Sequence, residues 1–517
     1  MKKQINTKIA TFIATVSLII FIASCSSQQA NIDVNNVKIN SGIVSGKLTA
    51  DSAVKIFMGL PFAAPPVGEL RWKAPQPVQA WEGVRECTVP PPSAMQGKPM
   101  PFFGWTKEFL IPDEPISEDC LYLNVWTPAQ TDNDKLPVIV WIHGGGFTGG
   151  SGTVPLYDGE AMARKGVVFV TINYRLGIFG FLVHPELSAE TENRISGNYG
   201  ILDQIAALQW VRDNIAAFGG DPDKVTIAGQ SAGAMSVNLL VVSPQAKGLF
   251  SRAIAQSGGM FGKSFGMGQT LQDAEESGKQ LTDRIGASIN DLRMLAADSV
   301  LKIRGRFSTV VDNVVILPVS ETFAQGRQND VSLISGWNAD DGVSFGNPNK
   351  EQFRQMIKMQ YGENADRFLE MFPALTDEEA AQSQKLMSAL TFGWNNYTWA
   401  KLQTETGKSK AYLYYFKRVP PGEPNYGAFH SAEFGYALHT LNRWERPFTD
   451  TDYRLEEIMS SYWVNFAATG DPNGEGLPVW KAFDNDSTEV IEFGNETKAA
   501  PLPFQKQLYF MNEMNKQ

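Results

Sequence analysis

The stretch Gly229-Gln230-Ser231-Ala232-Gly233 decides how this chain folds. Residues 224–228 before it are apolar and β-branched, which predicts a buried strand, and residues 234–241 after it have a helical pattern. A serine at such a junction lies on a tight strand-to-helix turn that requires small neighbours. The turn places the Ser231 hydroxyl outside the sheet edge, beside a helix N-terminus. We therefore predict a nucleophile elbow, a geometry suited to acyl transfer through a serine ester.

Strands and helices alternate on both sides of this turn. Expected strands lie at residues 37–48, 54–57, 121–126, 137–142, 167–173, 252–256, 331–336 and 411–416, and expected helices at 202–218 and 453–469. This alternation predicts an α/β fold with a central, mostly parallel sheet that helices cover on both faces. Residues 270–325 and 349–407 are largely helical in pattern. We expect them to be insertions over the carboxyl ends of the strands, where a substrate pocket would form.

The composition is that of one large globular domain. The 517 residues are 43% hydrophobic and 19% charged, with no long Pro/Ser linker, internal repeat or low-complexity tract. We assign residues 37–512 to a single domain. The net charge is −10 and no basic stripe occurs, so the sequence argues against nucleic acid as a partner. It indicates no oligomeric state.

The N-terminus is typical of an export signal, so we leave residues 1–24 out of the fold. Its mostly apolar run, residues 9–23, follows three lysines and is short for a membrane span. The run leads into Ile22-Ala23-Ser24-Cys25, which is similar to the bacterial lipobox. We expect a lipid on Cys25, a tether over residues 25–36, and an exported lipoprotein held at the outer membrane only by this anchor. A plain secretory signal is the alternative.

A serine nucleophile needs a base, which is usually histidine. The chain has four histidines: His143, His184, His430 and His439. In folds with this turn the order along the chain is nucleophile, acid, base, which leaves the last two. His430 stands in a glycine-containing loop after a strand, whereas His439 lies in a helical pattern, so we predict His430 as the base. The histidines are too scattered to predict a metal site.

The acid should follow a strand between Ser231 and His430. Residues 331–336 are a suitable strand, and the turn after them contains Asp340 and Asp341. Asp341 or Asp340 would orient the imidazole and stabilise its cation. Two adjacent carboxylates cannot both point inward, so the other is expected to be solvated or to cap the turn. The alternative is a simple Asp-Asp-Gly turn without a catalytic role.

A tetrahedral oxyanion needs fixed hydrogen-bond donors. The expected strand at 137–142 leads into His143-Gly144-Gly145-Gly146-Phe147. Glycines allow bare backbone N–H groups to approach a substrate closely. We predict that the N–H groups of Gly145, Gly146 and Ala232 form a three-donor oxyanion hole.

Two cysteines remain if Cys25 carries lipid. Cys87 and Cys120 are then an even pair in an exported protein, which favours a disulfide. Two buried thiols are the alternative.

Several separate stretches carry a resemblance to one family. They are Ser117–Asn124, Thr226–Gly233, Gly59–Ala63 with Arg71, Asn198–Gly200 with Asp203 and Gln204, Gln256–Gly258, and Tyr462–Trp463 with Asn465–Phe466. On these stretches the chain resembles a type B carboxylesterase, in the α/β-hydrolase branch that also holds cholinesterases and neuroligins. The resemblance covers residues 37–510.

The resemblance implies a catalytic triad, an oxyanion hole and a disulfide. The implied triad is Ser231, Asp341 and His430, the implied oxyanion donors are Gly145, Gly146 and Ala232, and the implied disulfide joins Cys87 and Cys120. Arg71 and Glu118 match a family ion pair. The sequence departs from the family in its acid, which is more often Glu, so the Asp loop or the imidazole must lie closer.

We therefore expect a serine carboxylesterase that hydrolyses a small-molecule ester through an acyl-enzyme and requires no cofactor. One rival is a catalytically silent binding or adhesion protein on the same fold, although such relatives typically lose the nucleophile. A second is an esterase for acyl or feruloyl groups on polysaccharides, which would use the same chemistry. A lid-activated lipase is disfavoured because the sequence has no strongly amphipathic lid.

Overall fold

The fold is taken from a computed structural model that describes residues 31–113, 115–262, 269–342, 348–486 and 488–515. Cys25 and the expected signal and tether, apart from residues 31–36, lie outside the described residues.

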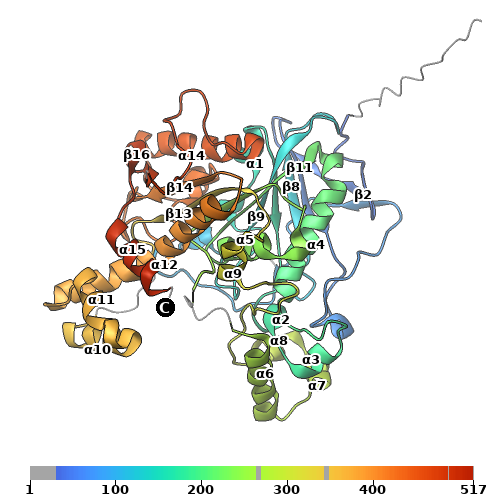
Figure 1. Cartoon of the computed structure of the whole chain (residues 1–517). Coiled ribbons are helices and arrows are strands. Elements are labelled where there is room, and N and C mark those ends of the chain that lie inside the picture. Colours follow the sequence, from blue (N-terminus) through green and yellow to red (C-terminus); the bar gives the residue numbers. More distant parts are fainter. Residues whose placement is uncertain (1–30, 114, 263–268, 343–347, 487, 516–517) are drawn as a thin grey trace, which may run out of the picture.

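A mixed, mostly parallel sheet forms the centre of the molecule (Figure 1). In the described part of the chain it has eleven strands, in the order β16-β15-β14-β13-β12-β11-β9-β10-β8-β4-β3. Their bounds are β3 Lys47–Leu48, β4 Lys55–Pro61, β8 Tyr122–Thr127, β9 Leu136–Ile142, β10 Val168–Ile172, β11 Gly220–Gln230, β12 Arg252–Gln256, β13 Ser332–Asn338, β14 Ala411–Phe416, β15 Glu489–Phe493 and β16 Thr497–Pro501. The predicted α/β fold class is confirmed.

The parallel part of the sheet runs from β10 to β15, and antiparallel strands flank it on both sides. Within the described ranges, two small sheets lie outside it. One is formed by β1 (Val37–Ile39), β2 (Gly42–Ser45) and β5 (Val84–Glu86), and the other by β6 (Ser93–Ala94) and β7 (Ile116–Ser117). Parallel strands need crossover connections, and the helices between them supply these. The carboxyl ends of β9, β11, β13 and β14 therefore meet at one edge.

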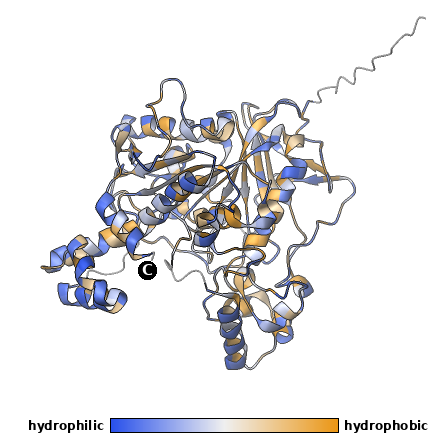
Figure 2. Cartoon of the chain, viewed as in Figure 1, coloured by the Kyte–Doolittle hydropathy of each residue, from blue (hydrophilic) through white to orange (hydrophobic). Residues whose placement is uncertain are grey.

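Alternate side chains of each central strand enter two separate cores. In β9, Val138, Val140 and Ile142 belong to one apolar cluster, whereas Ile139 and Trp141 belong to the other. This is the period of two that a strand buried on both faces requires. Figure 2 shows the apolar residues gathered in the interior and the polar ones on the outer helices.

Helices cover both faces of the sheet. The first cluster packs under α4 (Tyr199–Asn214), α5 (Ala232–Val242) and α12 (Asp377–Thr406), and the second under α14 (Asp450–Thr469) with α1 (Glu160–Arg164) and α13 (Phe434–Ala437). Three further helices of the body are α2 (Gly177–Phe181), α3 (Pro185–Ala189) and α15 (Gln505–Met514). Among the described residues, no helix combines the length and apolarity needed to cross a bilayer.

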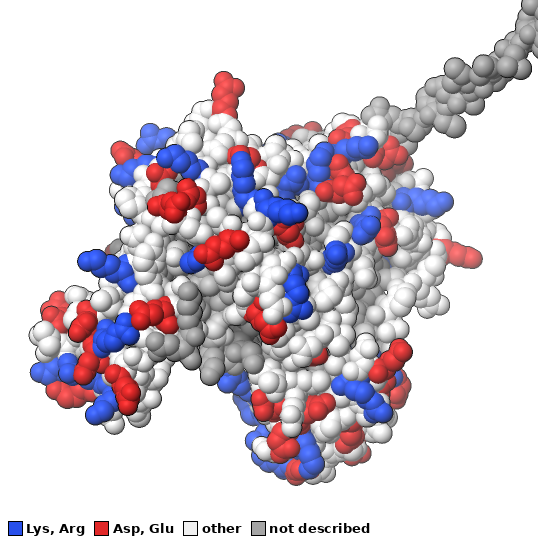
Figure 3. Space-filling view, viewed as in Figure 1, with Lys and Arg blue, Asp and Glu red and all other residues white. Residues whose placement is uncertain are grey.

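The two predicted helical insertions form two lobes that project from the same side of the molecule (Figure 1). The first contains α6 (Leu271–Ile285), α7 (Ile289–Met294) and α8 (Ala297–Leu301), followed by α9 (Val319–Ala324) against the body. The second contains α10 (Lys350–Tyr361) and α11 (Ala365–Met371), and leads into α12. Charges of both signs are interspersed over the face drawn in Figure 3.

One buried ion pair ties the first lobe to the body of the molecule. Arg71 donates two hydrogen bonds to the carboxylate of Glu118, at 2.7 and 2.6 Å. Its remaining terminal nitrogen donates to the carbonyl oxygens of Leu292, Arg293 and Leu295, which close α7. Both side chains are at most 10% exposed, so this pair lies in the interior and is not a surface contact.

The structure corrects one expectation. Cys87 and Cys120 are buried free thiols, so the bridge that the resemblance implies is not present. Burial raises the pKa of the Cys87 thiol to about 11 and raises that of Cys120 further. Both thiols are therefore protonated and pack in the first core cluster as small apolar groups.

Candidate active site

Ser231 lies on the turn between β11 and α5, as predicted. Its backbone has φ 56° and ψ −124°, a conformation that costs a non-glycine residue about 1–3 kcal/mol. Neighbouring contacts hold it there: the Ser231 N–H donates to the Gln256 carbonyl at 2.9 Å. A Cβ at Gly233 would overlap the Ile142 carbonyl oxygen, so the helix can start this close to β9 only with glycine.

The structure brings His430 against Asp341. Nδ1 of His430 donates to Oδ1 of Asp341 at 2.6 Å, and the Asp341 side chain is fully buried. The other Asp341 oxygen accepts the Asn338 N–H at 3.0 Å. This arrangement fixes the imidazole tautomer, with the proton on Nδ1 and the lone pair on Nε2.

Asp340 points elsewhere. It forms an ion pair with Lys385, and its carboxylate accepts the Ala428 N–H at 2.8 Å. Asp340 therefore fastens the loop that carries His430, whereas Asp341 touches the imidazole itself. Of the two carboxylates, it is therefore Asp341 that contacts the imidazole.

His430 lies beside the elbow. The Gln230 side-chain amide nitrogen is 3.2 Å from His430 Nε2 and 3.4 Å from Nδ1. Within the described residues we find no hydrogen bond between Ser231 Oγ and His430, although both line one cavity. Hydrogen bonds between nucleophile and base often tighten only when substrate is bound.

Aromatic rings enclose the imidazole. The Phe392 ring of α12 stacks on His430 with centroids 4.6 Å apart, and Trp105 meets it edge-on at 6.2 Å. Trp105 in turn donates to the Ser431 hydroxyl at 3.1 Å. These contacts leave His430 only 6% exposed, which restricts its rotation.

The predicted oxyanion donors lie beside Ser231. Gly145 and Gly146 have φ of 101° and 62°, which glycine adopts readily. Among the described residues, their N–H groups have no acceptor. The N–H of Ala232 opens α5 and has no partner within that helix. All three residues line the same cavity as Ser231 and His430.

His143 anchors this loop. Its Nδ1 lies 2.8 Å from the Gly144 carbonyl oxygen, and its ring stacks on Tyr174 at 4.4 Å. Burial lowers the pKa of His143 to about 4, so the ring is neutral at physiological pH. His143 therefore has a structural role and does not compete with His430 as a base.

The cavity that Ser231 opens into, here called the Ser231 cavity, has a volume of about 830 Å³. Its wall is mainly apolar and includes Met100, Phe102, Trp105, Phe109, Leu110, Ile111, Val154, Met235, Phe392 and Phe434. None of its described lining residues is Asp or Glu, and Lys98 pairs with Asp113 at 3.4 Å. The cavity thus suits a neutral, apolar ligand.

A second buried carboxylate, Glu433, lies behind the imidazole. It accepts hydrogen bonds from the Asn338 amide at 2.5 Å and the Gln256 amide at 3.2 Å. Burial, together with the negative charge of Asp341, raises the pKa of Glu433 to about 7. Since like charges in one buried site repel, Glu433 takes up its proton near neutral pH while Asp341 keeps the imidazole as partner.

Most of the predicted site residues meet here: Ser231, Asp341, His430, Gly145, Gly146 and Ala232 all lie around the Ser231 cavity or directly behind it. The sequence did not point to Gln230, Phe392 or Glu433. Gln230 and Glu433 stand within motifs that carry the triad, so their position was a usable signal. Phe392 lies in a helical insertion, where the local pattern does not indicate which side chain reaches the site.

Glu433→Gln tests the buried carboxylate. In the wild type, the unfolded carboxyl ionises above its ordinary pKa of 4.5, whereas the folded one keeps its proton up to about 7. Stability is therefore lost as pH rises through this window, by about 3 kcal/mol in total. We expect the Tm of Glu433→Gln, measured relative to wild type by thermal unfolding, to rise between about pH 5 and pH 8. A Tm difference that is constant with pH would contradict the assignment.

Comparison with known proteins places the chain in one family. A model of the carboxylesterase family matches residues 33–511. The chain is 36% identical over 483 residues to fumonisin B1 esterase of Sphingopyxis macrogoltabida, covering 88% of this chain and 86% of that protein. It is 33% identical over 478 residues to para-nitrobenzyl esterase of Bacillus subtilis (strain 168), covering 87% and 93%.

A solved structure agrees with these relatives. A thermophilic PNB esterase superposes with a TM-score of 0.78 at 31% sequence identity, over 92% of this chain and 99% of the other. The chain therefore belongs to the carboxylesterase family and is a carboxylic-ester hydrolase of the serine esterase type.

Proposed function

We propose that this protein hydrolyses neutral carboxylic esters through a triad of Ser231, Asp341 and His430. One observation carries the proposal: Asp341 holds His430 at 2.6 Å within a cavity that also exposes Ser231. The tautomer that Asp341 imposes leaves Nε2 free of a proton, which a general base requires.

In the reaction, Ser231 Oγ attacks the ester carbonyl carbon while His430 Nε2 takes the hydroxyl proton. Asp341 stabilises the imidazolium that forms, and the oxyanion accepts hydrogen bonds from Gly145, Gly146 and Ala232. Each such donor typically contributes about 3 kcal/mol. The imidazolium then protonates the leaving alkoxide, and the alcohol departs. A water deprotonated by His430 then attacks the acyl-enzyme. The imidazolium returns this proton to Ser231 Oγ as the acyl C–Oγ bond breaks, and the carboxylic acid leaves.

The wall of the Ser231 cavity favours ester substrates with apolar or aromatic groups. Its aromatic side chains offer contact area, and the absence of Asp and Glu among the described lining residues gives no counter-charge for a cationic substrate. The name of one relative, para-nitrobenzyl esterase, refers to an aromatic ester, which fits the same kind of wall.

We further propose that Cys25 carries a lipid that anchors the protein to the outer membrane after export. The support is the sequence alone: positive charge, a short apolar run and Ala23-Ser24 immediately before Cys25. Residues 25–36 would then tether the hydrolase domain of residues 37–512.

Ser231→Ala and His430→Ala test the proposed chemistry. We expect each to lower kcat for p-nitrophenyl butyrate by about 10⁴-fold or more, since both residues act in one step. A fluorophosphonate probe should label the wild type and not Ser231→Ala. Wild-type protein that resists the probe and shows no turnover would instead favour the binding-protein alternative.

Asp341→Asn and Asp340→Asn form a matched pair that tests the acid. The first should lower kcat by about 10³–10⁴-fold, because the amide no longer supports the imidazolium or its tautomer. The second should change kcat by less than about threefold and lower the Tm, because it weakens contacts to Lys385 and Ala428. The reverse ranking of the kcat values would reassign the acid.

Cys25→Ser tests the anchor. The variant should move from the membrane fraction to the soluble fraction of the cell, while purified protein keeps its kcat for p-nitrophenyl butyrate. Retention of Cys25→Ser in the membrane fraction would contradict the lipoprotein assignment.

A further inference from the structure

The described chain is fixed to the body of the molecule at its N-terminal end. Asn31 forms a β-bridge with Thr131, and the Ile32 N–H donates to the Gln130 carbonyl at 2.9 Å. Ile32 is buried in the first core cluster, and a Cβ at Gly219 would lie 3.4 Å from its Cδ1 atom. Gly219 directly precedes β11. A tether that leads into Asn31 is therefore attached at the edge of the sheet where the parallel strands begin.

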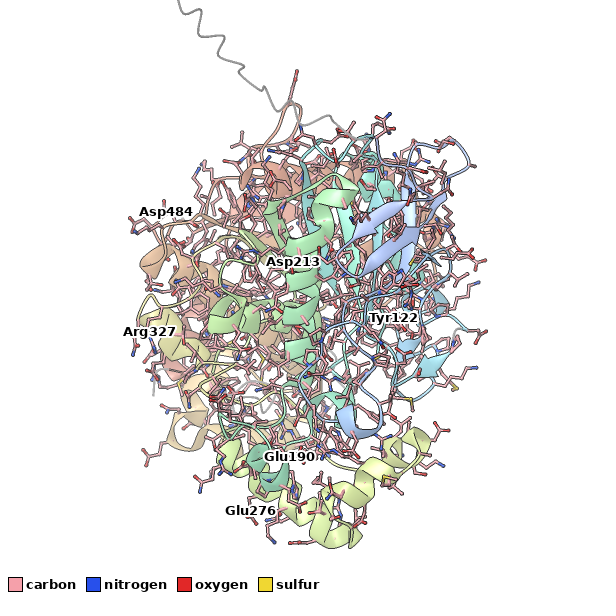
Figure 4. The ribbon with its side chains drawn as sticks, turned by 90° about the vertical axis from the view of Figure 1, so that its right-hand side faces the viewer. Tyr122, Glu190, Asp213, Glu276, Arg327 and Asp484 are labelled. Atoms are coloured by element: carbon pink, nitrogen blue, oxygen red, sulfur yellow. The ribbon has the colours of Figure 1, made fainter. Side chains whose placement is uncertain are left out.

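The Ser231 cavity lies at the opposite edge of the sheet. β11 begins beside Ile32 and ends at Gln230, directly before Ser231, and its eleven residues span about 30 Å. The glycine loop after β9 and the His430 loop after β14 line the cavity at this same edge. In Figure 1 the described chain begins at the top right, whereas both helical lobes project at the bottom. In the side view of Figure 4, Glu276 of the first lobe also lies at the base.

The mouth of the Ser231 cavity has an apolar rim. Met100 and Phe102 line the cavity and are 78% and 53% exposed, so they mark its opening. Exposed apolar side chains are typical of a membrane contact or of the entrance to a ligand groove. The length of the tether decides between these two interpretations.

The tether is short compared with the domain. The proposed lipid site, Cys25, lies six residues before Asn31, which is at most about 22 Å of fully extended chain. A compact domain of residues 37–512 has a radius of gyration of about 23 Å, and hence a radius of about 30 Å. If the cavity mouth touched the membrane, Asn31 would stand above it by at least the length of β11, about 30 Å. The tether does not reach that height, and it is also too short for the domain to lie on its side.

The edge of the sheet that carries the tether is polar. Asp33 and Asn36 follow Ile32, Lys135 precedes β9 and Asp223 lies near the start of β11, and all four side chains are exposed. Burial of such charges in hydrocarbon is costly. This edge therefore suits contact with hydrated lipid headgroups and does not insert into the bilayer.

We propose that the protein stands on its membrane with the amino edge of the sheet toward the lipid headgroups and the mouth of the Ser231 cavity toward the aqueous compartment. Its substrates are then esters that arrive dissolved in water, and not lipids of the bilayer that carries the enzyme. The rim of Met100 and Phe102 receives the apolar part of such an ester. This orientation rests on the lipid anchor at Cys25 and on the hydrolysis at Ser231 proposed above.

Fluorescence energy transfer from the full-length lipoprotein to a rhodamine-labelled lipid tests the orientation. The protein is reconstituted in vesicles of phosphatidylethanolamine and phosphatidylglycerol, with a donor dye on Lys135→Cys at the anchored edge or on Met100→Cys at the mouth. We expect at least about twofold weaker transfer from Met100→Cys, because its dye stands farther from the membrane by about the 30 Å of β11. Wild type, in which Cys87 and Cys120 are buried, controls for unspecific labelling.

The outcomes separate the orientation from the anchor. Equal or stronger transfer from Met100→Cys, with the protein bound to the vesicles, would overturn the orientation and leave the anchor intact. If neither position shows transfer and the protein stays in the supernatant when the vesicles are sedimented, the anchor is wrong and the orientation with it. Turnover of p-nitrophenyl butyrate by the wild type checks the hydrolytic proposal separately.

An ester embedded in the same vesicles, p-nitrophenyl palmitate, tests the substrate class. Wild type on the vesicles is compared with unanchored Cys25→Ser at equal concentration. We expect anchoring to raise hydrolysis of the embedded ester by less than about twofold, because the anchored mouth does not reach the bilayer and gains nothing from the high local concentration there. A gain of about tenfold or more, which a mouth against the membrane would produce, would also refute the proposed orientation.

Discussion

The site depends on one steric constraint, the close approach of helix α5 to the end of strand β9. Gly233 lies against the Ile142 carbonyl oxygen, at a distance that admits no side chain. Because β9 and β11 are parallel neighbours, this contact fixes the elbow relative to the loop after Ile142. Ser231, the Ala232 N–H and the glycine loop thereby acquire their positions from a single packing contact. The hydrogen bond from the Ser231 N–H to the Gln256 carbonyl helps to sustain the backbone strain at Ser231.

Burial governs the electrostatics of the two carboxylates behind the imidazole. Asp341 and Glu433 both hydrogen-bond to Asn338, so two carboxylates share one low-dielectric region. Asp341 contacts His430, whereas burial and the nearby charge of Asp341 raise the pKa of Glu433 to about 7. This difference between the two carboxylates places the negative charge next to His430, where an imidazolium would form. The Phe392 ring of α12 stacks on the imidazole, and α12 also reaches the His430 loop through the ion pair of Lys385 with Asp340.

The sequence predicted the fold and most residues of the site, because short continuous segments of the chain indicate them. Ser231 is identifiable because strand, turn and helix follow one another within a few residues, and His430 because only two histidines fit the chain order. The sequence could not separate Asp340 from Asp341, since the difference is the direction of two adjacent side chains. The role of Phe392 could not be predicted from the sequence, because its contact with His430 depends on how a long inserted helix docks on the sheet. The cysteines show the limit of a resemblance: Cys87 and Cys120 are buried without a bond between them.

The buried Arg71 has a consequence for the order in which the chain folds. Its carboxylate partner is 47 residues away, but its carbonyl partners are 221 to 224 residues away. During synthesis the carbonyl groups emerge long after the guanidinium, which must stay hydrated or make other contacts until then. Closure of so large a loop is slow compared with local helix formation. The fastening of the α7 segment onto Arg71 is thus a late step of biogenesis, completed only after more than half of the polypeptide has left the ribosome.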